Sequence, residues 1–102
     1  MTQTLDIAVL PGDGIGREVM PACLALLAAA EPLTGGPSLR CTPWPAGALH
    51  YRDHGEALPA ATLEAAGKAD AILFGAMGWP EIRYPDGTEP IPQLDLRMAF
   101  DL

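Results

Sequence analysis

The chain has 102 residues, enough for one small domain and too few for two of ordinary size. Apolar residues make up 49% of it, which is enough to fill the core of a soluble globular protein. Thirteen acidic residues against six basic ones leave a net charge of −7, with no cluster of lysine or arginine. Such a chain repels a phosphate backbone, so we expect no nucleic-acid partner.

The two cysteines, Cys23 and Cys41, have no metal-ligand spacing. We therefore expect neither a disulfide framework nor a zinc site. A reduced, cytoplasmic setting fits this cysteine usage. The longest apolar run, residues 22–30, is too short for a membrane span, and the start of the chain lacks a signal-type pattern. We expect a cytoplasmic protein with no membrane partner.

The first half of the chain predicts a strand, a helix and a second strand. Residues 6–10 (DIAVL) are aliphatic and end at a proline and a glycine, which predicts a buried strand. Residues 15–30 predict a helix, with Pro21 kinking it or placing its start later. Residues 38–44 predict a strand with prolines at its far end, as at a sheet edge. The helical spacing rests on Ile15, Val19, Cys23, Leu26 or Leu27, and Ala30.

The second half begins with a short helix at residues 48–54 and a further helix after Pro59. Residues 70–76 (DAILFGA) form the clearest strand, apolar at its centre as if helices covered both faces. Residues 78–92 hold four prolines and predict a long loop, of the kind that is usually functional. Helical spacing returns at residues 93–102, where the chain stops without a cap, so we expect a truncation within a helix. The order of elements predicts an α/β fold with a mostly parallel sheet.

A glycine-rich segment, PGDGIGREV, follows the first strand, where a dinucleotide-binding loop would lie. The Rossmann fingerprint needs glycine at its sixth position, which here is Arg17 when Gly12 is the first. No Gly-Lys-Ser/Thr follows, so a P-loop is also excluded. The local pattern favours a tight turn, with Gly14 at positive φ and Asp13 bonding nearby amides. Ligands nevertheless gather at this edge of α/β sheets.

Three further groups of residues are candidates for a site. Residues 75–80 (GAMGWP) leave the clearest strand, and Trp79 either stacks beside a ring or packs in the core. Arg97 either clamps a carboxylate or is a solvated helix residue. His50 and His54 lie one helical turn apart, but no third ligand has a plausible spacing, which favours surface or packing roles over a metal site.

Taken together, IAVLPGDGIGREV, ADAILFGAMGWP, a proline-rich loop and LRMAFDL resemble the start of the isocitrate/isopropylmalate dehydrogenase family. The resemblance runs along essentially the whole chain. It implies an α/β, isopropylmalate dehydrogenase-like fold that is distinct from the Rossmann fold. Residues 1–102 would be its N-terminal portion, strand-helix-strand-helix-strand. It further implies a metal-dependent, NAD- or NADP-linked oxidative decarboxylase of 2-hydroxy acids that forms a homodimer, with NAD and Mg²⁺ or Mn²⁺ as expected cofactors.

The resemblance also assigns residues by position. Arg97 resembles the first of several arginines that bind the carboxylates of a small 2-hydroxy-dicarboxylate substrate. Ile15 is similar to a residue that packs against the cofactor. The loop lining the nicotinamide and ribose side of the cofactor site would consist of Gly75, Ala76, Met77, Gly78 and Trp79.

Two features depart from isopropylmalate enzymes. Gln93 and Leu94 stand where those enzymes usually carry a leucine pair, and the glutamine opens the pocket to more polar substrates. The GWP at residues 78–80 is similar to tartrate or D-malate enzymes of the family. We expect NAD-dependent oxidative decarboxylation of the 3-isopropylmalate type, with a tartrate/D-malate-type enzyme as the alternative.

The family's catalytic tyrosine and lysine and its metal-binding aspartates have no match in this chain, so we assign it no catalytic residue and no metal ligand. The isolated chain is therefore expected to be inactive, as the N-terminal part of a longer enzyme. A non-catalytic truncated remnant and a stand-alone nucleotide-binding module remain as alternatives.

Overall fold

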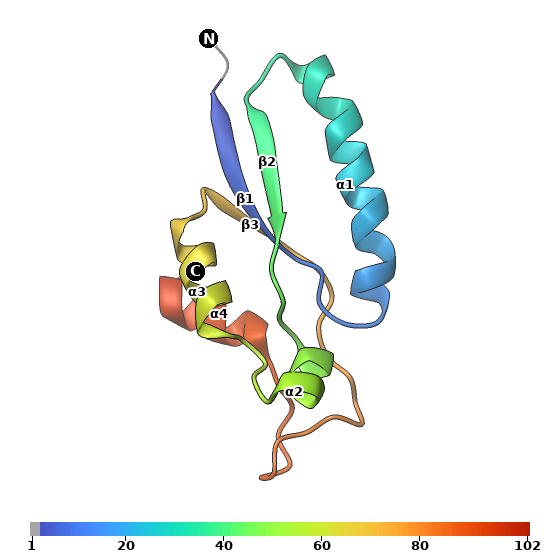
Figure 1. Cartoon of the computed structure of the whole chain (residues 1–102), viewed down its shortest axis with the longest axis vertical. Helices are drawn as coiled ribbons and strands as arrows, with labels where there is room; N and C mark the ends of the chain where they lie inside the picture. Colours follow the sequence, from blue (N-terminus) through green and yellow to red (C-terminus); the bar gives the residue numbers. More distant parts are fainter. Residues whose placement is uncertain (1–2) are drawn as a thin grey trace.

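A three-stranded parallel sheet forms the centre of the computed structural model, which describes residues 3–102 (Figure 1). The strand order is β2-β1-β3, and Ile7 in the central strand pairs with Cys41 on one side and Ala71 on the other. The predicted α/β class with a parallel sheet is therefore confirmed. The strands are β1 (Thr4–Leu10), β2 (Ser38–Pro43) and β3 (Ala71–Phe74).

Helices lie on both faces of the sheet. One long helix covers one face, two shorter helices cover the other, and a third short helix lies beyond the carboxyl ends of the strands (Figure 1). In that order they are α1 (Ile15–Thr34), α3 (Ala60–Lys68), α4 (Pro92–Phe100) and α2 (Ala48–His54).

The core is divided by β1 into two apolar clusters. Successive residues of a strand point to opposite faces. Ile7 and Val9 accordingly pack with Met20 of α1. Ala8 and Leu10 pack on the other face with a cluster that includes Ala46, Ala66 and Leu96. Val9 and Leu10 are fully buried, so β1 is the strand that both layers enclose.

The expectation that β3 is covered on both faces is confirmed in part. Ile72 and Phe74 pack against the cluster that contains Leu96, and Leu73 packs on the other face against the cluster that contains Met20. The strand predicted at residues 70–76 is shorter, and it lies at an edge of the sheet. Ile72, Leu73 and Phe74 are only half-buried. An apolar run identifies a strand, but it carries no information about which strands will pair beside it.

The helix α1 starts at Ile15, so the later start considered because of Pro21 is wrong. It also runs through Pro32 and ends at Thr34, four residues past the expected end at residue 30. Gly35 then stops the helix in a left-handed conformation. Pro21 lies on the exposed side of the helix, where water can bond the carbonyl oxygen that lacks an N–H partner.

The face that α1 turns to the sheet agrees only in part with its spacing, because Cys23 packs against the core as expected while the first two residues of the pattern do not. Met20 is buried, whereas Ile15 and Val19 are 63% and 50% exposed. Because alanine and leucine occur on several sides of this helix, the spacing predicts a helix without fixing its inner face.

The long connection from residue 75 to residue 91 is confirmed, and part of it packs closely. Tyr84 meets Tyr51 of α2 edge-on, with ring centroids 4.7 Å apart, and Pro90 is fully buried. The last helix, α4, ends at Phe100, and Asp101 follows with φ 56°. Among residues 3–102, no helix combines the length and apolar character needed to cross a membrane.

Candidate functional site

The turn after β1 and the loop after β3 are in direct backbone contact at the carboxyl edge of the sheet. The N–H of Asp13 donates a hydrogen bond to the carbonyl oxygen of Ala76 at 2.9 Å. A Cβ at Gly16 would lie 2.2 Å from the Pro11 oxygen and 2.5 Å from the Ala76 oxygen. Only glycine permits this approach, which occurs one residue before the position at which the Rossmann fingerprint demands it. The two segments predicted to contact a cofactor therefore form one unit.

Apolar side chains are exposed beside this contact. Gly14 has φ 47°, as predicted, and a Cβ there would lie 3.1 Å from Cζ3 of Trp79. Trp79 is 39% exposed, which rules out the core position considered for it. Ile15, directly after Gly14, is exposed as well. Two apolar side chains are thus available here to pack against a planar ring.

The other residues of the candidate loop differ in exposure. Ala76 and Gly78 are exposed, whereas Gly75 and Met77 are half-buried. Met77 packs against the apolar cluster that contains Leu96 of α4. The loop is therefore anchored on its inner side and open on its outer side.

Asp13 contacts amides that are distant in sequence, so the expectation of nearby partners is wrong. Its carboxylate accepts hydrogen bonds from the N–H groups of Ala48 and Leu49, at the start of α2, and of Gly78. These donors lie 35, 36 and 65 residues away along the chain. An aspartate between glycines is typical of a local turn bond, and only the fold brings the other segments to it.

The predicted substrate residues Gln93 and Arg97 line one pocket of about 290 Å³, together with Ile72 and Phe74 of β3. They lie four residues apart on α4 and therefore share a helix face. Arg97 is exposed. Within the described chain, the buried side-chain oxygen Oε1 of Gln93 has no hydrogen-bond partner. Such an atom is costly to leave unpaired.

The predicted cofactor and substrate residues come from two elements that share a core. Met77 from the loop after β3 and Phe74 from the strand itself pack on the same cluster as Leu96, which directly precedes Arg97. This shared packing fixes the loop relative to α4. The structure thus places both groups around the end of β3.

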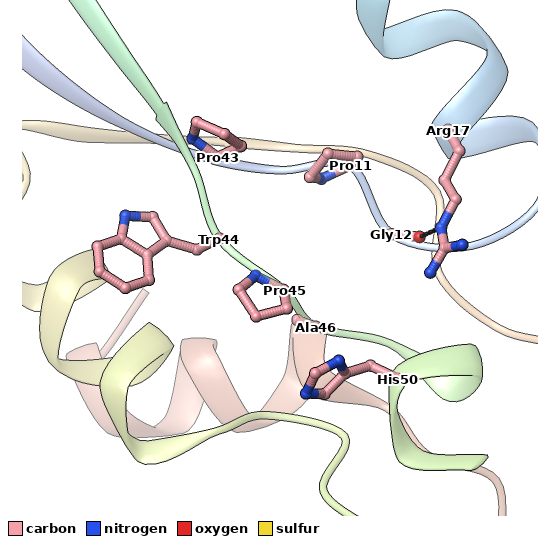
Figure 2. A pocket seen from close by; sticks show the side chains of 8 residues that line it. All are labelled: Pro11, Gly12, Arg17, Pro43, Trp44, Pro45, Ala46 and His50. Atoms are coloured by element: carbon pink, nitrogen blue, oxygen red, sulfur yellow. Dashed lines mark hydrogen bonds between the residues drawn. The ribbon is translucent and has the colours of Figure 1, made fainter. Parts of the chain in front are cut away.

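A second pocket, also about 290 Å³, contains none of the residues assigned to the substrate or the cofactor (Figure 2). Arg17 reaches it from α1, and its Nε donates to the Gly12 oxygen at 2.9 Å. His50 faces it from α2, beside Trp44 and Pro45. Burial, and next the charge of His54, lower the pKa of His50, which favours its neutral form. The sequence shows these residues but not their juxtaposition.

The two histidines considered as metal ligands pack against each other, with ring centroids 4.4 Å apart. Within residues 3–102, no three His, Cys, Asp or Glu side chains are grouped as a metal site requires.

The parallel sheet, its helical layers and the paired loops at its carboxyl edge define an α/β protein, and in open sheets of this class ligands gather at that edge. Residues 6–102 match the isocitrate/isopropylmalate dehydrogenase family, and the chain belongs to that family.

Relatives in sequence include two kinds of dehydrogenase. A 3-isopropylmalate dehydrogenase of Streptomyces griseus is 42% identical over 102 residues, which cover 99% of this chain and 28% of that protein. D-malate dehydrogenase [decarboxylating] of Escherichia coli is 43% identical over 82 residues, which cover 79% of this chain and 22% of that protein.

A solved structure supports the fold. The β-decarboxylating dehydrogenase of Thermococcus kodakarensis superposes with a TM-score of 0.75 at 32% identity, over 95% of this chain and 27% of that one. The isopropylmalate dehydrogenase-like fold is thereby confirmed. Nearly the whole of this chain matches such relatives, but it spans only about 28% of their length.

Proposed function

We propose that this chain is the N-terminal part of a cytoplasmic enzyme that oxidatively decarboxylates a 2-hydroxy acid with NAD. The 3-isopropylmalate type is our first candidate, because the family match extends over residues 6–102 and several relatives carry that name. The structural observation that carries the proposal is the pairing of Gln93 and Arg97 in one pocket, next to the loop after β3.

Arg97 is the proposed anchor for a substrate carboxylate. Its guanidinium can form two parallel hydrogen bonds to the two carboxylate oxygens and fix the orientation of the acid. Leu96 is 3% exposed and holds α4 against the sheet, so the position of the arginine is set by packing. The exposed guanidinium is accessible to a substrate.

Gln93 is the proposed determinant of substrate type. Its buried Oε1 requires a donor, and an isopropyl group supplies none. A hydroxyl or a water bridge from a more polar acid would satisfy it. This observation favours the second candidate, a D-malate- or tartrate-type enzyme of the same family.

NAD is the proposed cofactor, packed against Ile15 and residues 75–79. The exposed Ile15 and Trp79 beside Gly14 fit the face of a planar ring, and the small exposed residues Ala76 and Gly78 allow its ribose to approach the backbone. When bound, the nicotinamide accepts the hydride from the substrate carbon. The residues of this chain contribute binding and orientation.

The remaining groups are proposed to come from outside this chain. Because the chain has no match to the metal-binding aspartates of the family it resembles, we place the ligands of Mg²⁺ or Mn²⁺ in the sequence beyond Leu102. The full-length protein, meaning the chain continued to the length of its relatives, is proposed to be a homodimer. The isolated chain is proposed to be inactive.

Steady-state assays of the full-length protein test this proposal. NAD reduction is measured with Mn²⁺ and each of four acids: isopropylmalate, D-malate, tartrate and isocitrate. Arg97→Ala should lower kcat/KM by about 100-fold, because truncating one partner of a desolvated charge pair costs about 2–5 kcal/mol. Arg83→Ala is the matched control, since Arg83 pairs with Glu89 inside an exposed loop. Equal effects of the two variants would contradict the role of Arg97.

Substrate choice is decided by Gln93→Leu in the same assays. If Gln93 selects polar acids, the variant shifts preference towards isopropylmalate. A wild-type enzyme that strongly prefers isopropylmalate would contradict the role given to this glutamine and leave the first candidate.

Two further measurements test the alternative interpretations of the chain. Sequencing past the codon for Leu102 tests the remnant: an immediate stop codon supports a non-catalytic truncated product. Calorimetry of the isolated chain with NAD tests a stand-alone nucleotide-binding module, which undetectable binding at millimolar NAD would eliminate.

A further inference from the structure

Asp13 is the most enclosed acidic residue of the candidate site. It is 2% exposed and lies in the turn between β1 and α1. Its Oδ2 accepts from the N–H groups of Ala48 and Gly78, both at 2.8 Å, and its Oδ1 from that of Leu49 at 2.9 Å. One side chain therefore connects the turn, the start of α2 and the loop after β3.

The chemistry of this contact requires a carboxylate. An ionised carboxylate only accepts hydrogen bonds, which suits three backbone donors. An asparagine would direct an NH₂ group at one or more of these N–H groups and leave them unpaired.

The space around the carboxylate is also defined by the fold. A Cβ at Gly47 would lie 2.7 Å from both carboxylate oxygens. The Gly47 N–H donates to the Ala57 oxygen at 2.8 Å, so the backbone is held in place at this point. Gly47 has φ 124°, a conformation that side chains disfavour. A side chain at Gly47 would therefore meet the Asp13 carboxylate first and displace it.

Asp13 binds the loop at residues 75–79 twice. Its main-chain N–H donates to the Ala76 oxygen, and its side chain accepts from Gly78 two residues later. These two bonds fix the backbone on both sides of Met77, just before Trp79. Residues that hold such loops in a productive geometry strongly affect ligand binding.

We infer that Asp13 is a positioning residue: its carboxylate ties the loop at residues 75–79 to the start of α2 and so sets the binding geometry for the dinucleotide. The inference rests on the proposed function for the identity of the ligand. The link between Asp13 and the loop rests only on the contacts above.

Hydrogen exchange and kinetics of the full-length protein test this role together. In Asp13→Asn, amide exchange in residues 75–79 and 47–52 should accelerate by about ten-fold or more, because one charged acceptor for both segments is lost. KM for NAD should rise about ten-fold, the effect of losing one charge-assisted hydrogen bond, while KM for the 2-hydroxy acid changes by less than about two-fold. Gly47→Ala should reproduce the faster exchange in residues 75–79.

Two control variants separate positioning from general stability. Met20→Ala opens a cavity on the opposite face of the sheet and shows what lower stability alone does to exchange in the loop. Asp6→Asn makes the same chemical change at the exposed end of β1. Neither should change KM for NAD.

The outcomes are distinguishable. Unchanged exchange in residues 75–79 in both Asp13→Asn and Gly47→Ala overturns the inference, as does faster exchange with an unchanged KM for NAD. If Asp13→Asn fails to fold, Gly47→Ala decides. Absence of NAD reduction by the wild-type protein with all four acids overturns the proposed function, while the exchange result still reports on the link between Asp13 and the loop.

Discussion

An aspartate lies near each end of β1, and the two make different kinds of interaction. Asp6, near the amino end, has a side chain that is 50% exposed and pairs with Arg40, itself 67% exposed. Asp13, just past the carboxyl end, is buried and accepts three backbone hydrogen bonds. Water competes for the first pair and is excluded from the second group, so the same residue type contributes little at one end and much at the other.

The ends of the sheet differ in the same way. At the amino end, β1 and its neighbours meet solvent through charged side chains, and the Asp70 carboxylate accepts from the Asp6 N–H. At the carboxyl end, backbones touch through glycine, and Ala46 and Gly47 are buried. Substitutions should therefore lower the free energy of unfolding strongly where backbone contacts backbone, and only slightly where side chains are in water.

The largest effect is expected at Gly16. Gly16→Ala places a Cβ 2.2 Å from the Pro11 oxygen, and the opposing atoms are backbone that cannot rotate away. The free energy of unfolding should fall by about 3 kcal/mol or more, at the high end of single substitutions. Urea unfolding measures the change.

The matched control for that prediction is Gly36→Ala, in the connection that enters β2. A Cβ there meets only the Thr34 hydroxyl oxygen, at 3.4 Å, which is ordinary contact. Its effect should stay within about 0.5 kcal/mol. Similar losses for the two variants would show that the carboxyl edge is no tighter than the other end.

The next largest effect is expected at Leu96 in α4. It is 3% exposed and packs against the cluster that contains Leu10. Leu96→Ala should cost about 2–5 kcal/mol through lost burial and a residual cavity. Met98, on the same helix, is 85% exposed, so Met98→Ala should change the free energy of unfolding by less than about 0.5 kcal/mol. A small loss in Leu96→Ala would mean that α4 is loosely held, and Arg97 with it.

A smaller effect is expected at Thr62 in α3. Its buried hydroxyl donates to the Pro45 oxygen at 2.7 Å, which fastens α3 to the segment after β2. Thr62→Val keeps the shape and leaves that oxygen unpaired, at a cost of about 1–3 kcal/mol. Thr42→Val, at an exposed position of β2, is the isosteric control and should be near neutral. Thermal unfolding of the two variants at equal concentration would compare them.

The sequence predicted the helices and strands better than it predicted which of them lie side by side in the fold. Helix α2 is found at residues 48–54 as expected, and Gly14 has the predicted positive φ, because these features depend on adjacent residues. The central place of β1 and the partners of Asp13 depend on segments 30 or more residues away. Motif resemblance identified the family, while the contact between residues 11–16 and Ala76 emerged only from the fold.

The smallest effect is expected at Asp6, and it should depend on pH. The hydrogen bond from Arg40 lowers the pKa of Asp6 below its ordinary value of 3.8. A carboxyl group with a lowered folded-state pKa adds stability above its unfolded-state pKa, and this is lost as pH falls through the folded value. Asp6→Asn should therefore be slightly less stable than the wild type at pH 7, and the difference should vanish as pH falls below about 3.8.

Salt provides an independent check on Asp6. Because both side chains of the pair are exposed, raising the ionic strength at pH 7 should shrink the difference between Asp6→Asn and the wild type. Urea unfolding at several pH values and at low and high salt measures both effects. A loss in Asp6→Asn that is large and insensitive to pH and salt would show that water does not compete at the amino end of β1, and would remove the contrast with Asp13.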